Sequence, residues 1–218
     1  MRLAADVFSA TLLVVAALFP IVNPLGSSVI FLGLTDGYSH TLRASLARRI
    51  SVNSFILLVV SILIGGKVLD FFGISLPVVQ VGGGLVVVAM GWAILQQSDD
   101  APHTAVLNPA EASEKAFYPL TLPLTVGPGS ISVAVALGAN TQHQAYPWPA
   151  QLAALLLGPF LIALSVFISY RSAERLSKLL GRTGLSVFIR LSAFIVLCIG
   201  IQILWNGVAA LAHAAHFR

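Results

Sequence analysis

The chain has 218 residues, of which 57% are hydrophobic and only 9% are charged, and its mean hydropathy is +0.93. Soluble domains carry roughly 25% charged residues, so this composition excludes a water-soluble globular protein. A transmembrane β-barrel would show alternating segments of about 10 residues, whereas the apolar runs here are long and continuous. The composition therefore predicts an all-α integral membrane protein.

The formal net charge is +4 and the sequence pI is about 9.6. A basic chain can bind nucleic acid, but Lys and Arg that flank membrane spans account for the excess better. We therefore expect the lipid bilayer, and no nucleic acid, as a partner. The single cysteine, Cys198, excludes an internal disulfide and a cysteine metal cluster, and no metal site is predicted. It is expected to pack as a small hydrophobic residue.

The first apolar stretch covers residues 7–34, which is roughly 42 Å if helical. Because the hydrocarbon core is only about 30 Å thick, a straight helix would overrun it. Pro20 and Pro24 each remove a backbone donor and disturb the preceding turn. We expect two half-helices separated by a break between Pro20 and Gly26, with Ser27 as the N-cap of the second half.

Two further spans complete the first half of the chain, at residues 50–65 and 76–95. A loop at residues 35–49 is expected before them. Glycines 82–84 and Gly91 predict a third span with a small face, which lets membrane helices approach closely.

A polar linker at residues 96–115 is expected to divide the chain into a first repeat, residues 1–95, and a second repeat, residues 116–218. The fourth span, residues 116–140, contains a second break from Leu122 to Ser130, after which a helix is expected to restart near Ser130. The last spans are expected at residues 150–170 and 187–211, with a basic loop between them.

The distribution of Lys and Arg predicts the orientation. Nine lie in the links after spans one, three and five: Arg43, Arg48, Arg49, Lys115, Arg171, Arg175, Lys178, Arg182 and Arg190. The opposite side has only Arg2, Lys67 and Arg218. The positive-inside rule then predicts six spans with both termini periplasmic.

Two three-span halves have opposite orientations, so the chain is predicted to be an inverted repeat with spans 1 and 4 broken near the membrane midplane, a pattern typical of transporters. Each unpaired backbone group in hydrocarbon costs several kcal/mol, so irregular backbone persists only around a cavity or within protein. Helix N-termini suit a carboxylate, and the carbonyls that end the preceding half-helices suit an ammonium group or a cation. The pattern predicts a small zwitterionic substrate.

The candidate substrate-binding residues all lie at the two breaks: Pro20, Asn23, Pro24, Gly26, Ser27, Thr121, Pro123, Thr125, Gly127, Pro128, Gly129 and Ser130. Asn23 could alternatively cap or cross-link helices. The spans hold almost no ionisable side chain, so a proton relay of buried carboxylates is not expected. No cofactor is predicted, and H⁺ or Na⁺ remain open as coupling ions.

Single polar residues in the other spans, namely Asn53, Gln80, Gln202 and Asn206, are expected to form hydrogen bonds between helices. No nucleophile–base set or catalytic residue is visible, so an enzyme is not predicted.

The motifs Phe19-Pro20-Ile21-Val22-Asn23-Pro24-Leu25-Gly26 and Gly127-Pro128-Gly129-Ser130-Ile131 resemble the MarC family of bacterial membrane proteins. The segment Phe72-Gly73-Ile74-Ser75 before Gly82-Gly83 is also similar to that family, so the resemblance covers nearly the whole chain. It implies a six-span protein of the cell inner membrane, related to transporters of small neutral amino acids.

Three functions therefore stay open. The first is a secondary transporter of small neutral amino acids such as glycine or alanine. The second is an exporter of other small metabolites through the same site. The third is a scaffold or regulatory membrane protein that transports nothing and binds partners through residues 96–115. The oligomeric state is left open.

Overall fold

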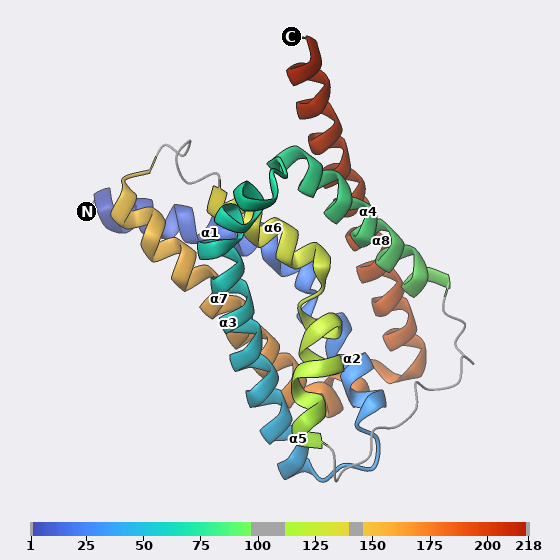
Figure 1. Cartoon of the computed structure of the whole chain (residues 1–218). Coiled ribbons are helices and arrows are strands. Elements are labelled where there is room, and N and C mark those ends of the chain that lie inside the picture. Colours follow the sequence, from blue (N-terminus) through green and yellow to red (C-terminus); the bar gives the residue numbers. More distant parts are fainter. Residues whose placement is uncertain (1, 97–111, 140–145, 217–218) are drawn as a thin grey trace.

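A computed structural model describes residues 2–96, 112–139 and 146–216, and within these residues all regular secondary structure is helical, with no strand (Figure 1). The elements are α1 (Arg2–Val22), α2 (Pro24–Leu34), α3 (His40–Phe72), α4 (Leu76–Gln96), α5 (Ala112–Lys115), η2 (Ala116–Thr125), α6 (Pro128–Ala139), α7 (Trp148–Arg171) and α8 (Ala173–His216). The segment η2 is an irregular coil, because its backbone is extended at Tyr118 and Leu122. Among the described residues, five stretches are long and apolar enough to cross a bilayer, or six if η2 and α6 form one bent span. The helical membrane class is confirmed.

The two breaks differ in shape. At the first, the helical ladder continues across the interruption, because the Asn23 N–H donates to Phe19 O and the Ser27 N–H donates to Asn23 O, both at 2.9 Å. Residues Leu3–Leu34 thus form one continuous candidate span. At the second break, η2 and α6 are bent by 71°, so the chain turns sharply there.

Both helices after the breaks begin earlier than predicted. α2 begins at Pro24 and α6 at Pro128, so the expectation that each helix starts at a serine is wrong. Proline suits the first helical position because its missing N–H would have no intrahelical partner there. Asn23 is the N-cap of α2: its backbone is left-handed, with φ 46° and ψ 61°, and its side chain accepts from the Gly26 N–H at 3.2 Å.

α3 is longer than the predicted second span at both ends. Ser39 caps its start by accepting from the Leu42 N–H at 3.3 Å, so the predicted loop at residues 35–49 shrinks to five residues, 35–39. The helix also passes through the two glycines at 65 and 66, where a Cβ on Gly65 would overlap Val135 of α6. That glycine provides close packing rather than a helix end, and α3 stops only before Gly73, which has φ 67°.

The predicted basic loop after span five is helical. α8 begins at Ala173 and contains one interruption, at Gly181, with φ 63° and ψ −179°. Lys and Arg are good helix formers, so their charges mark the edge of the membrane and not a loop. Residues 97–111 and 140–145, which hold most of the predicted linker and of the fourth link, lie outside the described residues.

α4 and α8 pack against each other through glycine. A Cβ on Gly84 would lie 2.6 Å from the Leu204 backbone nitrogen, and a Cβ on Gly200 would lie 2.7 Å from the Val88 backbone nitrogen. The close-packing face predicted for the third span is therefore confirmed at Gly84. Gly82 does not belong to it, since nothing lies within 4 Å of its Cβ position.

Candidate functional site

The two breaks lie side by side. Ser27, at the start of α2, is buried, and its Oγ lies 3.3 Å from Val22 O and 3.5 Å from Leu124 O of η2. A Cβ on Gly129 of α6 would lie 3.7 Å from the Ile21 side chain. Segments about a hundred residues apart in the chain thus meet inside the bundle.

Hydroxyl side chains at the breaks donate to carbonyls of the local backbone. Thr121 Oγ1 donates to Ala116 O at 2.7 Å, Thr125 Oγ1 donates to Leu120 O at 2.6 Å, and Ser130 Oγ donates to Gly127 O at 2.9 Å. Irregular backbone at membrane depth needs such partners because lipid supplies none. These hydroxyls therefore stabilise the breaks, and their remaining lone pairs stay able to accept.

Tyr170, in the last turn of α7, joins this site although the sequence analysis gave it no role. It is fully buried, its hydroxyl lies 2.7 Å from Thr125 Oγ1, and the Ser27 hydroxyl lies beside it too. Its ring stacks on Phe31 of α2, with centroids 4.5 Å apart and planes 20° from parallel. The sequence signal for this role is a tyrosine at the end of an apolar span, since a tyrosine hydroxyl that is buried usually finds a hydrogen-bond partner.

The polar residues of the other spans divide into two groups. Asn53 of α3 donates from Nδ2 to Thr121 Oγ1 at 3.4 Å, which confirms the predicted bond between helices. Gln202 Nε2 instead donates to Asn206 Oδ1 within α8, at 2.8 Å, so the prediction of an interhelical bond is wrong for this pair. Cys198 is exposed on α8 and does not pack inward as expected.

α4 covers the second break, because Gly129 packs against the Val87 side chain and the Cβ position of Gly127 lies 3.5 Å from the Met90 side chain.

The twelve candidate residues differ in burial: Pro24, Gly26, Ser27, Thr121, Thr125, Gly127, Gly129 and Ser130 are buried, Pro20 and Asn23 are half-buried, and Pro123 and Pro128 are exposed. The twelve positions include no ionisable side chain, so partial charges from hydroxyls and helix ends dominate. The breaks thus offer polar groups but no charged side chain.

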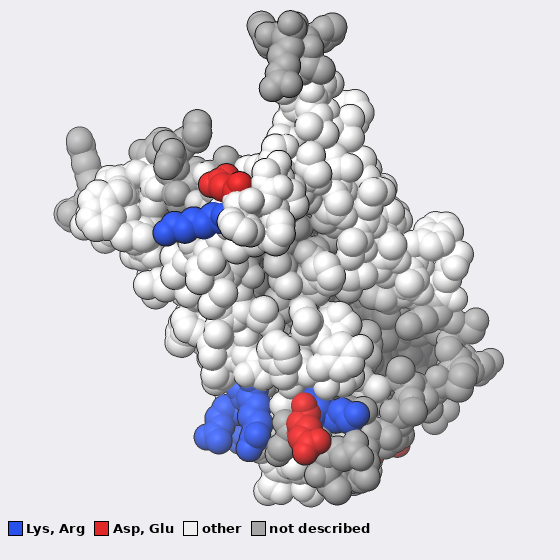
Figure 2. Space-filling view, viewed as in Figure 1, with Lys and Arg blue, Asp and Glu red and all other residues white. Residues whose placement is uncertain are grey.

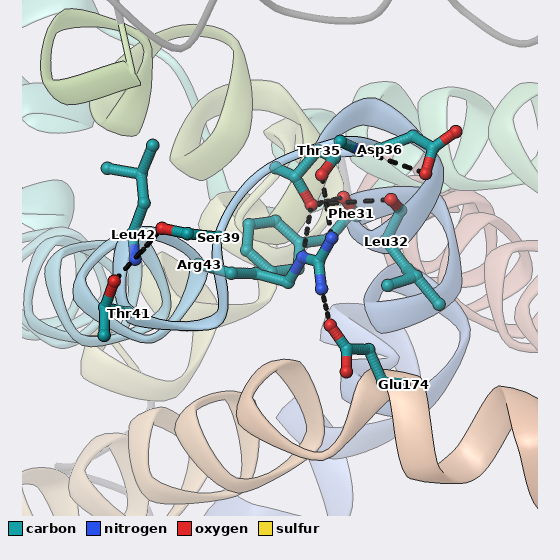
Figure 3. Close-up of polar contacts among 10 residues, drawn as sticks. Phe31, Leu32, Thr35, Asp36, Ser39, Thr41, Leu42, Arg43 and Glu174 are labelled. Carbon is teal, nitrogen blue, oxygen red and sulfur yellow. Dashed lines mark hydrogen bonds and ion pairs between the residues drawn. The ribbon is translucent and has the colours of Figure 1, made fainter.

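A second polar cluster joins α2, α3 and α8 (Figure 3). Arg43 is only 8% exposed; it donates from Nε to Thr35 Oγ1 at 3.1 Å and from Nη2 to Thr35 O at 2.9 Å, and Nη1 pairs with Glu174. Thr35 Oγ1 lies 2.7 Å from Phe31 O. The sequence predicts a loop around Arg43, and this prediction is wrong. Because α3 begins at His40, Arg43 falls instead on the helix face that buries Ile50.

Comparison with known proteins assigns the chain to a family. Residues 8–212 match the profile described as MarC family integral membrane protein. The chain belongs to the MarC family. Proteins named UPF0056 inner membrane protein MarC from Escherichia coli O1:K1 / APEC and from Escherichia coli (strain K12) are each 32% identical to it over 221 residues, which cover 97% of this chain and 99% of the relative.

The family and the apolar helices together make this MarC-family chain a protein of the inner membrane. No solved structure matches it. The family match over residues 8–212 confirms the resemblance noted from the two proline–glycine motifs.

Proposed function

We propose that this MarC-family protein is a secondary transporter of small neutral amino acids of the size of glycine or alanine, which bind between the two helix breaks. The observation that carries the proposal is the contact between the breaks, where Ser27 Oγ lies 3.5 Å from Leu124 O. Interrupted helices that meet inside a bundle are typical of transporter sites.

The contacts between helices support an inverted repeat. If the halves correspond, α1 matches η2, α2 matches α6, α3 matches α7, and α4 matches α8. When each helix is replaced by its counterpart, the main contacts remain contacts. The α1–α7 pair becomes η2–α3, and the α2–α7 pair becomes α6–α3. The α4–α6 pair becomes α8–α2. α4 and α8 pack on each other. A two-fold relation between the halves accounts for all of these pairs together.

The chemistry of the breaks favours a zwitterion with a neutral side chain. The N-terminus of α6 carries the positive end of a helix dipole, which attracts a carboxylate. In α2 the dipole acts in the same way, although the Gly26 N–H is already bound by the Asn23 side chain. The carbonyls before the breaks, such as Val22 O and Leu124 O, can accept from an ammonium group or bind H⁺ or Na⁺ through oxygen. A charged side chain on the substrate would lack a counter-ion among Ser27, Thr125 and Tyr170, so small neutral amino acids suit the site best.

The charge distribution supports a cytoplasmic location for the end of the molecule where α3 begins. Figure 2 shows blue Lys and Arg side chains gathered at that end, and an uncharged middle. Both chain termini lie toward the opposite end (Figure 1). By the positive-inside rule, this distribution supports a periplasmic location for both termini.

Uptake of radiolabelled glycine and alanine into proteoliposomes tests the proposal, with H⁺ and Na⁺ gradients imposed in either direction. We expect saturable transport of at least one amino acid. Gly129→Leu should abolish it, because the new side chain would overlap Val87 and approach Ile21. Gly82→Leu is the matched control, since its Cβ position is empty, and it should transport normally. If neither amino acid shows saturable uptake under any gradient, the proposed substrate class is wrong.

A further inference from the structure

A groove of mixed polar and apolar lining lies between α4, α6 and α8, outside the site described above. Its volume is about 180 Å³, and its polar lining comes from Gln80, Ser132 and Asn206, one residue from each helix. A cavity needs only about 10–15 Å³ of such volume to hold a water molecule, so this groove has room for several.

The groove opens within the apolar zone, on the side of the chain termini. Asn206 lies eight residues before the end of the span Ser186–Ala214, or about 12 Å along the helix. Gln80 lies in the second turn of α4, which begins at the same end. The Asn206 amide oxygen accepts from Gln202 of the same helix, whereas Gln80 lines the groove from α4. An amide at this depth is costly against lipid unless water or a polar molecule meets it.

The groove lies about one helical turn from the second break. Ser132 lies on the groove side of α6, and its Oγ donates to Gly129 O at 2.8 Å, in the first turn of that helix. No residue lining the groove is ionisable, so its chemistry matches that of the breaks.

The opposite end of the same site is closed by the Arg43 cluster. Thr35, which caps the C-terminus of α2, is fully buried, and Arg43 binds both its hydroxyl and its carbonyl. The ion pair with Glu174 then ties the end of α2 to the start of α8. Tyr170 lies four residues before Glu174 and stacks on Phe31, so the closure reaches the residues at the breaks.

We propose that the groove lined by Gln80, Ser132 and Asn206 is an access site for small neutral solutes from the side of the chain termini, and that Arg43, Thr35 and Glu174 form the closed gate on the basic side. This inference rests on the proposed function, because it describes how a solute reaches the breaks. The structure is thus the state that is open toward the termini.

Cysteine accessibility tests both ends without any transported solute. Cys198→Ser removes the one cysteine of the chain, and Asn206→Cys then places a thiol in the groove. A membrane-impermeant methanethiosulfonate should label it from the side of the termini at least about tenfold faster than Phe194→Cys, because thiolate forms in water and not in lipid. Phe194 is exposed on the same helix but does not line the groove.

The gate is tested with Ser27→Cys, which reports on the breaks. With Glu174 intact, labelling from the basic side should be negligible. Glu174→Gln removes the charge that holds Arg43, so labelling from that side should rise at least about tenfold. Glu174→Asp, which keeps the charge on a shorter side chain, should give an intermediate rate. Glu114→Gln, an exposed carboxylate on α5, is the matched control and should change nothing.

Two results would overturn the inference: equal labelling of Asn206→Cys and Phe194→Cys, or a Ser27→Cys thiol that stays protected from the basic side in the Glu174→Gln protein. If both labelling results are as expected but glycine and alanine are not transported, the access site and gate stand and only the substrate assignment fails.

Discussion

Tyr170→Phe removes the hydroxyl that lies 2.7 Å from Thr125 Oγ1 and leaves the ring free to stack on Phe31. A neutral hydrogen bond contributes about 0.5–1.5 kcal/mol net, and polar pairs between membrane helices average about 0.6 kcal/mol. Thr125 keeps its bond to Leu120 O, so this variant leaves Thr125 with a partner. We expect it to lower the free energy of unfolding by about 1 kcal/mol.

Thr125→Val should cost more, because it leaves both Leu120 O and the Tyr170 hydroxyl without this partner. An orphaned buried group costs about 1–3 kcal/mol, so we expect a loss of about 2 kcal/mol. In the double variant the two losses should not add, since the shared bond is already gone in either single variant. The expected coupling energy is about 1 kcal/mol.

The measurement is reversible unfolding in mixed micelles with increasing dodecyl sulfate, followed by circular dichroism, for the wild type, both single variants and the double variant. All four proteins must share one denaturant dependence, so that only the midpoint moves. A coupling energy below about 0.3 kcal/mol, the usual limit of additivity, would refute the bond between α7 and the second break.

Two further predictions concern stability in the same assay. Gly84→Ala should destabilise the protein by about 1–3 kcal/mol through overlap with the Leu204 backbone, whereas Gly82→Ala, with an empty Cβ position, should be neutral or stabilising by up to about 1 kcal/mol; equal effects would contradict the glycine contact between α4 and α8. Asn23→Ala should cost about 1 kcal/mol for the lost cap on Gly26 and roughly 1–2 kcal/mol for the left-handed backbone. Asn23→Gly should lose only a few tenths of a kcal/mol, and a cost as large as that of alanine would argue against the left-handed cap.

The class of fold could be predicted from the sequence, because long apolar runs predict membrane helices. Proline and glycine act locally on the backbone and mark where α1 and η2 give way to α2 and α6, but the helical ladder continues across the first of these points. The limits of α3 could not be predicted from the sequence. Charged residues before Ile50 indicated a loop, whereas Ser39 caps a helix there and Arg43 is buried by contacts with Thr35 and Glu174. Those contacts depend on residues far apart in the chain.

Some residues of the candidate site could likewise be predicted from the sequence, and others could not. The hydroxyls of Thr121 and Thr125 stood out because they flank prolines in an apolar run. Tyr170 did not, since it ends a span next to Arg171, where an aromatic residue at the membrane interface is common. Its role depends on the stacking with Phe31 and the bond to Thr125, which only the packed bundle creates.

Gly181 has a consequence for mutational scans of this chain. It is exposed, and nothing lies within 4 Å of its Cβ position, so a ranking by burial or crowding would score it as tolerant. Its backbone, at φ 63° and ψ −179°, is a conformation essentially reserved for glycine. Every amino acid other than glycine carries a β-carbon, so any substitution at this position strains the backbone. Position 181 should therefore stand out as intolerant on an otherwise permissive surface.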